Sequence, residues 1–151
     1  LRVDVTGLAA AQKLLNGLGP NMGKASAEAA EDMVFEASRL AKLRAADAPK
    51  RRTRLYWGSI HPEISKAQFK VTGAIASNVK YAPYLEFGTK AHVIVPVKAK
   101  ALFWRGAAHP VKKVNHPGTR AYRVLGSAAE AALKRAREFV DKAVARHFSK
   151  P

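Results

Sequence analysis

The stretch MGKASAEAAEDMVFEASRLAKLRAA, from Met22 to Ala46, repeats apolar residues at the spacing of an α-helix. A period of 3.6 residues places such positions on one face of the helix. Glu28, Asp32 and Glu36 follow one another at four-residue spacing and form an acidic stripe on another face. The stretch therefore predicts a long helix that packs through its apolar face, whose members are Ala30, Met33, Val34, Ala37, Leu40 and Ala41.

The stretches on both sides of this helix show strand and helix patterns. Alternating apolar and polar residues are typical of strands, whereas apolar residues three or four positions apart are typical of helices. Strands grouped between helices favour an α+β fold, with an antiparallel β-sheet packed against two long α-helices, one N-terminal and one C-terminal. Besides the helix at 22–46, the expected elements are a strand at 1–5, a short helix at 7–19, two strands at 55–64 and 67–77 joined near Ser65, a β-branched run at 92–97, and a helix at 127–148.

Length and charge limit the possible functions. The chain has 151 residues, the size of one ordinary domain, so residues 1–151 are expected to form a single unit. Lys and Arg number 27 against 11 Asp and Glu, which gives a formal net charge of +16. A domain this basic usually meets nucleic acid, an acidic protein surface or an anionic membrane. A generally solvated basic surface is the alternative.

Cysteine is absent from the sequence, which excludes disulfides and thiolate metal sites. The first residues, LRVDVTG, lack the pattern of a signal peptide, and no apolar run approaches the length of a membrane span. We therefore expect a protein that is made and used inside the cell and has no membrane partner.

The basic residues concentrate in a long loop at 98–123, which is interrupted by prolines and glycines. No acid occurs between Phe87 and Ala129, and the aromatic residues Phe103, Trp104 and Tyr122 lie among the bases. Such a tract can contact phosphates, but it lacks the signature of a base-reading module. It fits a surface that faces DNA without reading its sequence, or one that faces the acidic stripe of a neighbouring copy. The basic residues are Lys98, Lys100, Arg105, Lys112, Lys113, Arg120 and Arg123.

Glu86 is the carboxylate to test for catalysis, because it lies in the aromatic-rich stretch VKYAPYLEFGTKAH, Val79 to His92. A catalytic acid or base needs a partner within hydrogen-bond reach, and a metal pair needs a second carboxylate. The histidines at 92, 109 and 116 match no hydrolase or zinc spacing, and no second acid lies nearby. We therefore expect no catalytic residue, no metal site and no cofactor.

The same stretch is better explained as a structural turn. Tyr81, Tyr84 and Phe87 are expected to anchor it by burial, while Pro83 and Gly88 set the backbone. Glu86 is then expected to pair with a base or to accept backbone donors.

Several short motifs follow one another in the chain: Tyr81-Ala82-Pro83-Tyr84, Glu86-Phe87-Gly88-Thr89, Pro96, Lys100-Ala101-Leu102-Phe103 and His116-Pro117-Gly118. In their order and spacing they resemble the tail-component family of long-tailed bacteriophages, whose members are also called neck or tail-completion proteins. The resemblance runs from about Ala25 to Leu133 and includes the first-half features Pro49, Leu55 and Ser59-Ile60. This chain departs from the family pattern at Thr53-Arg54-Leu55 and at Ala121-Tyr122-Arg123-Val124.

The resemblance implies a non-enzymatic virion protein, assembled in the host cytoplasm, that forms a homo-oligomeric ring between the DNA-filled head and the tail tube. Its implied neighbours are head-connector and tail-terminator or tail-tube proteins, with non-specific contact to passing DNA. A sixfold ring is expected, with a twelvefold ring as the alternative. Because ring closure needs two unlike complementary patches on each copy, the acidic stripe and the basic tract form the candidate pair. A free, sequence-independent nucleic-acid-binding protein is the alternative function.

Overall fold

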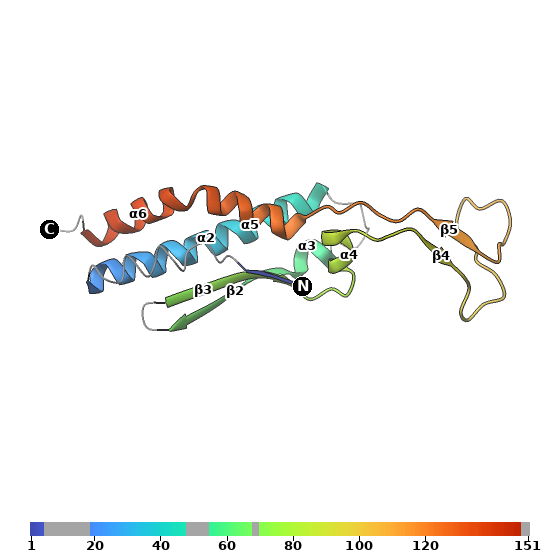
Figure 1. Ribbon diagram of the computed structural model, residues 1–151, viewed down its shortest axis with the longest axis horizontal. Helices are drawn as coiled ribbons and strands as arrows, with labels where there is room; N and C mark the ends of the chain where they lie inside the picture. Colours follow the sequence, from blue (N-terminus) through green and yellow to red (C-terminus); the bar gives the residue numbers. More distant parts are fainter. Residues whose placement is uncertain (5–18, 48–54, 68–69, 149–151) are drawn as a thin grey trace.

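The computed structural model describes residues 1–4, 19–47, 55–67 and 70–148, and it has an α+β fold with antiparallel sheets (Figure 1). The predicted short helix at 7–19 lies almost entirely outside these residues. The described elements are β1 (Arg2–Asp4), α2 (Pro20–Asp47), α3 (Leu55–Ser59), β2 (Ile60–Ala67), β3 (Lys70–Ser77), α4 (Ala82–Phe87), β4 (His92–Ile94), β5 (Val114–His116), α5 (Val124–Lys134) and α6 (Ala136–Phe148).

Helix α2 forms the centre of the body, as the periodicity of its sequence predicts. It contacts the sheet strands β2 and β3 on one side and the helices α5 and α6 on the other (Figure 1). Small side chains dominate its buried face and let the neighbouring elements approach closely. The buried apolar residues of α2 are Ala25, Ala29, Ala30, Met33, Val34, Ala37 and Ala41, and Leu40 is partly buried.

The body sheet has the order β1-β3-β2, and its neighbouring strands are antiparallel. The pairing of β2 with β3 runs from Ile60 opposite Ser77 to Ala67 opposite Lys70. The central strand β3 is buried continuously from residue 73 to residue 77, so side chains on both of its faces are covered, and α2 contacts it. Pro62 lies in β2 at the edge of the sheet, where a residue without an N–H group is tolerated.

Two sequence predictions about this region are wrong. Residues 55–59 form helix α3 and not the first half of a strand, and Ser59 Oγ donates a hydrogen bond of 2.8 Å to the carbonyl of Tyr56 one turn earlier. The predicted connection near Ser65 is also displaced, because β2 continues through Ala67. Ser65 is exposed on an edge strand, so a polar residue there does not require a turn.

The predicted C-terminal helix at 127–148 is two helices, α5 and α6. Helix α5 ends at Lys134, and Arg135 leaves the helical path with φ −98° and ψ 10° before α6 begins at Ala136. Helix α6 packs on α2, while α5 contacts α2 and, to a smaller extent, β1 and β3. Neither proline nor glycine marks the break, which explains why the sequence pattern does not reveal it.

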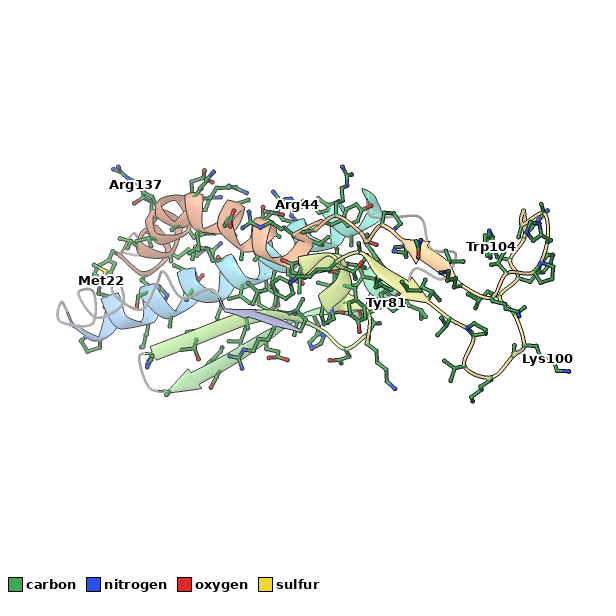
Figure 2. All side chains as sticks on the ribbon, turned by 45° about the vertical axis from the view of Figure 1, so that its right-hand side comes forward. Met22, Arg44, Tyr81, Lys100, Trp104 and Arg137 are labelled. Atoms are coloured by element: carbon green, nitrogen blue, oxygen red, sulfur yellow. The ribbon has the colours of Figure 1, made fainter. Side chains whose placement is uncertain are left out.

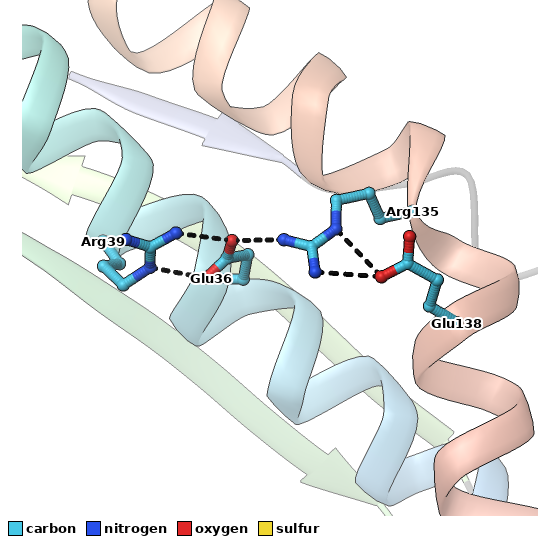
Figure 3. A network of polar contacts seen from close by, with 4 residues as sticks. All are labelled: Glu36, Arg39, Arg135 and Glu138. Atoms are coloured by element: carbon cyan, nitrogen blue, oxygen red, sulfur yellow. Dashed lines mark hydrogen bonds and ion pairs between the residues drawn. The ribbon is translucent and has the colours of Figure 1, made fainter.

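A network of charged side chains spans the break between α5 and α6 (Figure 3). Glu36 on α2 accepts hydrogen bonds from Arg39 at 2.7 and 2.9 Å and from Arg135 at 2.6 Å. Arg135 also donates to Glu138 at 2.9 and 3.0 Å. Arg135 therefore joins α2 to α6 at the position where the C-terminal helices separate.

This network predicts a loss of stability in acid. Hydrogen bonding from Arg39, supported by the charges of Arg39 and Arg135, holds the pKa of Glu36 below its ordinary value of 4.5. Because the folded pKa is lowered, the stabilisation is complete above the ordinary value and is lost as the pH falls through the lowered pKa. We expect the urea midpoint of the wild type to fall between about pH 6 and about pH 3, and that of Glu36→Gln to fall less steeply. An equal fall of the urea midpoint in the wild type and in Glu36→Gln would contradict this role for Glu36.

Candidate functional site

Glu86 connects α4 to the start of α5. Its carboxylate is buried, and it accepts hydrogen bonds from the backbone N–H groups of Leu125 at 2.9 Å and Gly126 at 2.7 Å. These amides belong to the first turn of α5, where N–H groups lack intrahelical partners and negative charge is favoured. Acceptance of backbone donors is one of the two arrangements that the sequence predicted. The arrangement explains Glu86 as a structural cap.

Tyr56 lies close to Glu86, and its pKa is changed by this environment. Burial, with a smaller contribution from the nearby Glu86 charge, raises the pKa of Tyr56 above its ordinary value. The Tyr56 ring lies 6.4 Å from that of Tyr81, which is partly buried against the core. The tyrosine pair and the capped helix thus form the end of the body to which the residues after α4 are attached.

The prediction that Tyr84 and Phe87 are buried anchors is wrong. Their exposed fractions are 60% and 69%, whereas Ala82 and Glu86 on the same short helix are buried. The segment is a helical turn, so residues 82 and 86 share the inner face and the rings at 84 and 87 face away from it. Pro83 occupies the first turn of α4, and Gly88 ends the helix with φ 73°.

The chain after α4 forms an arm, residues 89–122, that projects from one end of the body (Figure 1). At its foot, Thr89 and Thr119 exchange backbone hydrogen bonds of 2.9 and 3.1 Å. Gly88 and Gly118 border this pair with φ of 73° and 90°. A Cβ on Gly88 would lie 2.4 Å from the carbonyl oxygen of Thr119, and one on Gly118 would lie 2.3 Å from that of Thr89. The foot therefore requires glycine at both positions.

The arm continues as two short paired strands without a hydrophobic core of their own. Strands β4 and β5 pair over three residues each, and Leu102 and Val111 exchange backbone hydrogen bonds further out. Val97 is 91% exposed, and other large apolar side chains of the arm are also on the surface. They are Val93, Ile94, Val95, Phe103 and Trp104. An isolated two-stranded ribbon is marginally stable in water, so the arm is suited to contact a partner.

The structure places most of the predicted basic tract on this arm. The exposed residues Lys98, Lys100, Arg105, Lys112, Lys113 and Arg120 all lie there, and Arg120 stacks 5.0 Å from the centre of the Tyr122 ring. Lys90, which the predicted loop at 98–123 does not include, is also exposed on the arm. Arg123 differs from the others, because it lies at the start of α5 and pairs with Glu130 at 2.5 Å. We therefore separate Arg123 from the basic surface.

The acidic stripe, which the sequence offered as the partner of the basic tract of a neighbouring copy, is engaged within its own chain. Glu28 pairs with Arg146 and with His147, and Asp32 contacts Arg146 at 3.3 Å. Glu36 is held in the network described above. The stripe thus joins α2 to the C-terminal helices, and it does not offer unpaired carboxylates to the basic tract of another copy.

Two of the histidines tested above for hydrolase and zinc spacing form a pair at the base of the arm, which their spacing did not predict. His92 and His116 lie opposite each other on β4 and β5, with ring centres 5.0 Å apart. They line a hollow of about 740 Å³ together with Tyr84 and Lys90. Within the described residues, no group of three or more His, Cys, Asp or Glu side chains is arranged to hold a metal ion.

Comparisons with protein-family models, with curated proteins and with solved structures found no match to this chain. Among the described residues, the helices are too short or too polar to cross a lipid bilayer.

Proposed function

We propose that the protein is a structural component of the neck or upper tail of a long-tailed bacteriophage. In this role it forms a ring that joins the head-proximal connector to the tail tube and lets DNA pass, without catalytic activity. A sixfold ring is our first choice and a twelvefold ring the alternative. The resemblance of residues 25–133 to the tail-component family motivates the proposal.

The observation that carries the proposal is the projecting arm. It leaves the body as a separate extension (Figure 1), and several of its large apolar side chains are exposed in the described chain. A monomer that works alone gains nothing from such an exposed ribbon, whereas an assembly subunit buries it against a neighbour. A ring built from one type of subunit needs a surface that reaches the next copy or the next ring. The exposed aliphatic residues of the arm, Val93, Val95 and Val97, supply such a surface.

The contacts between copies in the proposed ring are apolar and not charged. The carboxylates of the acidic stripe are already paired within their own chain, which weakens the case that charge attraction between the stripe and the basic tract holds the copies together. We propose that apolar contacts of Val93, Val95 and Val97 with neighbouring subunits or rings take this role, and that the neighbours include the head connector and the tail terminator or tail tube.

Particles provide the test. We expect the chain in purified, nuclease-treated phage particles, detected by mass spectrometry, and located as a ring at the head–tail junction by cryo-electron microscopy. The double variant Val93→Ser, Val97→Ser changes only exposed side chains, so it is expected to fold normally but to be missing from particles. Lys142→Ser, at an exposed position on α6, is the control and is expected to be incorporated. Absence of the wild-type chain from particles would contradict the proposal and favour a free nucleic-acid-binding protein.

A further inference from the structure

The distal end of the arm, residues 98–113, carries exposed basic side chains and most of the lining of an apolar hollow; we call it the arm tip. Figure 2 shows Lys100 and Trp104 at the end of the molecule far from Arg137 and Met22. Phe103 and Trp104 are 67% and 49% exposed, although both are large aromatic residues. Ile94 and Val114 from β4 and β5 complete the hollow, which measures about 340 Å³ and is lined by Ile94, Leu102, Phe103, Trp104 and Val114.

The charge on the arm tip has no counter-charge in the described chain. Five exposed bases lie within this segment, and none forms an ion pair with a described acid. They are Lys98, Lys100, Arg105, Lys112 and Lys113. The carboxylates whose side chains are described are all engaged in the body, by the ion pairs of Glu28, Glu31, Asp32, Glu36, Glu63, Glu130, Glu138 and Asp141 and by the backbone bonds of Glu86. The carboxylates described on a second copy are thus already paired, which favours a different partner as the source of negative charge.

The composition of the arm tip distinguishes a nucleic acid from an acidic protein. Lysine is depleted in the centres of protein–protein interfaces, whereas four of the five bases here are lysines. Lysine and arginine side chains that carry no internal counter-ion are suited to phosphates, whose neutralisation releases condensed cations. Exposed aromatic rings beside such bases provide faces on which nucleobases stack without regard to their identity.

We propose that the arm tip binds single-stranded nucleic acid without sequence preference. The phosphates lie along Lys98, Lys100, Lys112 and Lys113, and a base stacks on Trp104 or Phe103 at the hollow. Single strands are favoured over duplex because paired bases do not offer their faces to the rings. The inference goes beyond the proposed ring function, since it assigns a ligand to the tip of each subunit whether or not the ring forms.

The direct test measures fluorescence anisotropy of the full chain with a labelled oligothymidine of about 20 nucleotides and with a mixed-sequence duplex of equal phosphate number. We expect tighter binding to the single strand, and an affinity that falls linearly with salt on logarithmic axes. The double variant Lys112→Ala, Lys113→Ala is expected to reduce the salt slope for the single strand by about 1.4, or about 0.7 per lost phosphate contact. Trp104→Ala is expected to weaken single-strand binding roughly tenfold and to leave the duplex affinity and the salt slope unchanged.

A matched control separates the arm tip from the general positive charge of the protein. Lys134→Ala, Lys142→Ala removes two exposed lysines from α5 and α6, and thus changes the net charge as the tip variant does. We expect it to leave the salt slope unchanged, and all variants to melt at the wild-type temperature. An equal reduction of the salt slope in the control and tip variants would overturn the proposal. An equal loss of affinity for single strand and duplex in Trp104→Ala would overturn it as well. So would tip variants that alter the sedimentation of the protein alone, because the tip would then be a contact between copies. Failure of the DNA experiment leaves the particle test of the proposed function unaffected.

Discussion

Glu86→Ala is expected to lower the free energy of unfolding by about 2–4 kcal/mol, because it leaves two amides at the start of α5 without an acceptor. The Leu125 amide is buried, so water cannot replace the carboxylate there without opening the structure. The Gly126 amide is only partly buried and recovers part of its loss from solvent. The expected loss of stability is therefore smaller than the combined penalty for two fully buried unsatisfied donors.

Glu86→Gln refines this prediction. Glutamine keeps one acceptor oxygen but turns an NH₂ group toward the second amide, so we expect a loss of about 1–2 kcal/mol. Glu130→Gln is the matched control, because Glu130 is exposed and pairs only with the exposed Arg123. Its effect is expected to stay within about 0.5 kcal/mol.

Urea unfolding at neutral pH measures all three variants, and amide hydrogen exchange locates the effect. Exchange at Leu125 and Gly126 should become faster in Glu86→Ala than exchange in the middle of α5. Equal urea midpoints for Glu86→Ala and Glu130→Gln would show that the carboxylate does not stabilise the helix start. A nuclease or protease activity of the pure protein that Glu86→Gln abolishes would contradict its structural assignment.

Backbone hydrogen bonds next to Glu86 show that this region also holds the arm to the body. The N–H of Tyr122 donates to the carbonyl of Leu85 at 2.8 Å, and the N–H of Arg123 donates to that of Glu86 at 3.3 Å. The chain that leaves the body at α4 is thus bonded to the chain that returns to it before α5. Loss of the Glu86 cap is expected to loosen the attachment of the arm as well as the start of α5.

The elements that the sequence predicts well are those whose signal is local and periodic. The helix predicted at 22–46 is α2, because a long apolar stripe has no competing interpretation. The order of helices and strands was enough for the α+β class, and the lack of acids between residues 87 and 129 was enough to find most of the arm's bases. These features depend on residue type and spacing, which the sequence shows directly.

The predictions that failed depend on contacts between distant residues. The burial of Tyr84 and Phe87 was inferred from their aromatic character, but whether a ring points inward on α4 is decided by Glu86 reaching α5, 39 and 40 residues away. Arg135, at the break between α5 and α6, is bonded to Glu36, which is 99 residues away. The partners of the acidic stripe within the chain, Arg146 and His147, were not foreseen because they lie in the last turn of α6. None of these pairings leaves a local pattern.

Gly73→Ala is expected to destabilise the protein by about 1–3 kcal/mol, because the added methyl group has no room in the core. A Cβ built on Gly73 would lie 2.1 Å from Cγ2 of Val34, which is fully buried on α2. The lower backbone entropy of alanine in the unfolded state offsets this by only about 0.4–1 kcal/mol. The obstacle is a packed side chain on a helix, so strand β3 and helix α2 must separate or Val34 must leave its rotamer.

Removing the obstacle tests this explanation. Val34→Ala alone opens a cavity and is expected to cost about 2 kcal/mol. In the double variant Gly73→Ala, Val34→Ala, the new methyl group occupies part of that space, so the combined loss should be smaller than the sum by about 1 kcal/mol or more. Gly58→Ala is the control, since nothing lies within 4 Å of its added Cβ and its φ is not positive. In helix α3 this change is expected to be neutral or slightly stabilising. The losses of stability are measured by urea unfolding. If the loss in the double variant equals the sum of the two single losses, the close approach of β3 to α2 is not the reason for glycine at position 73.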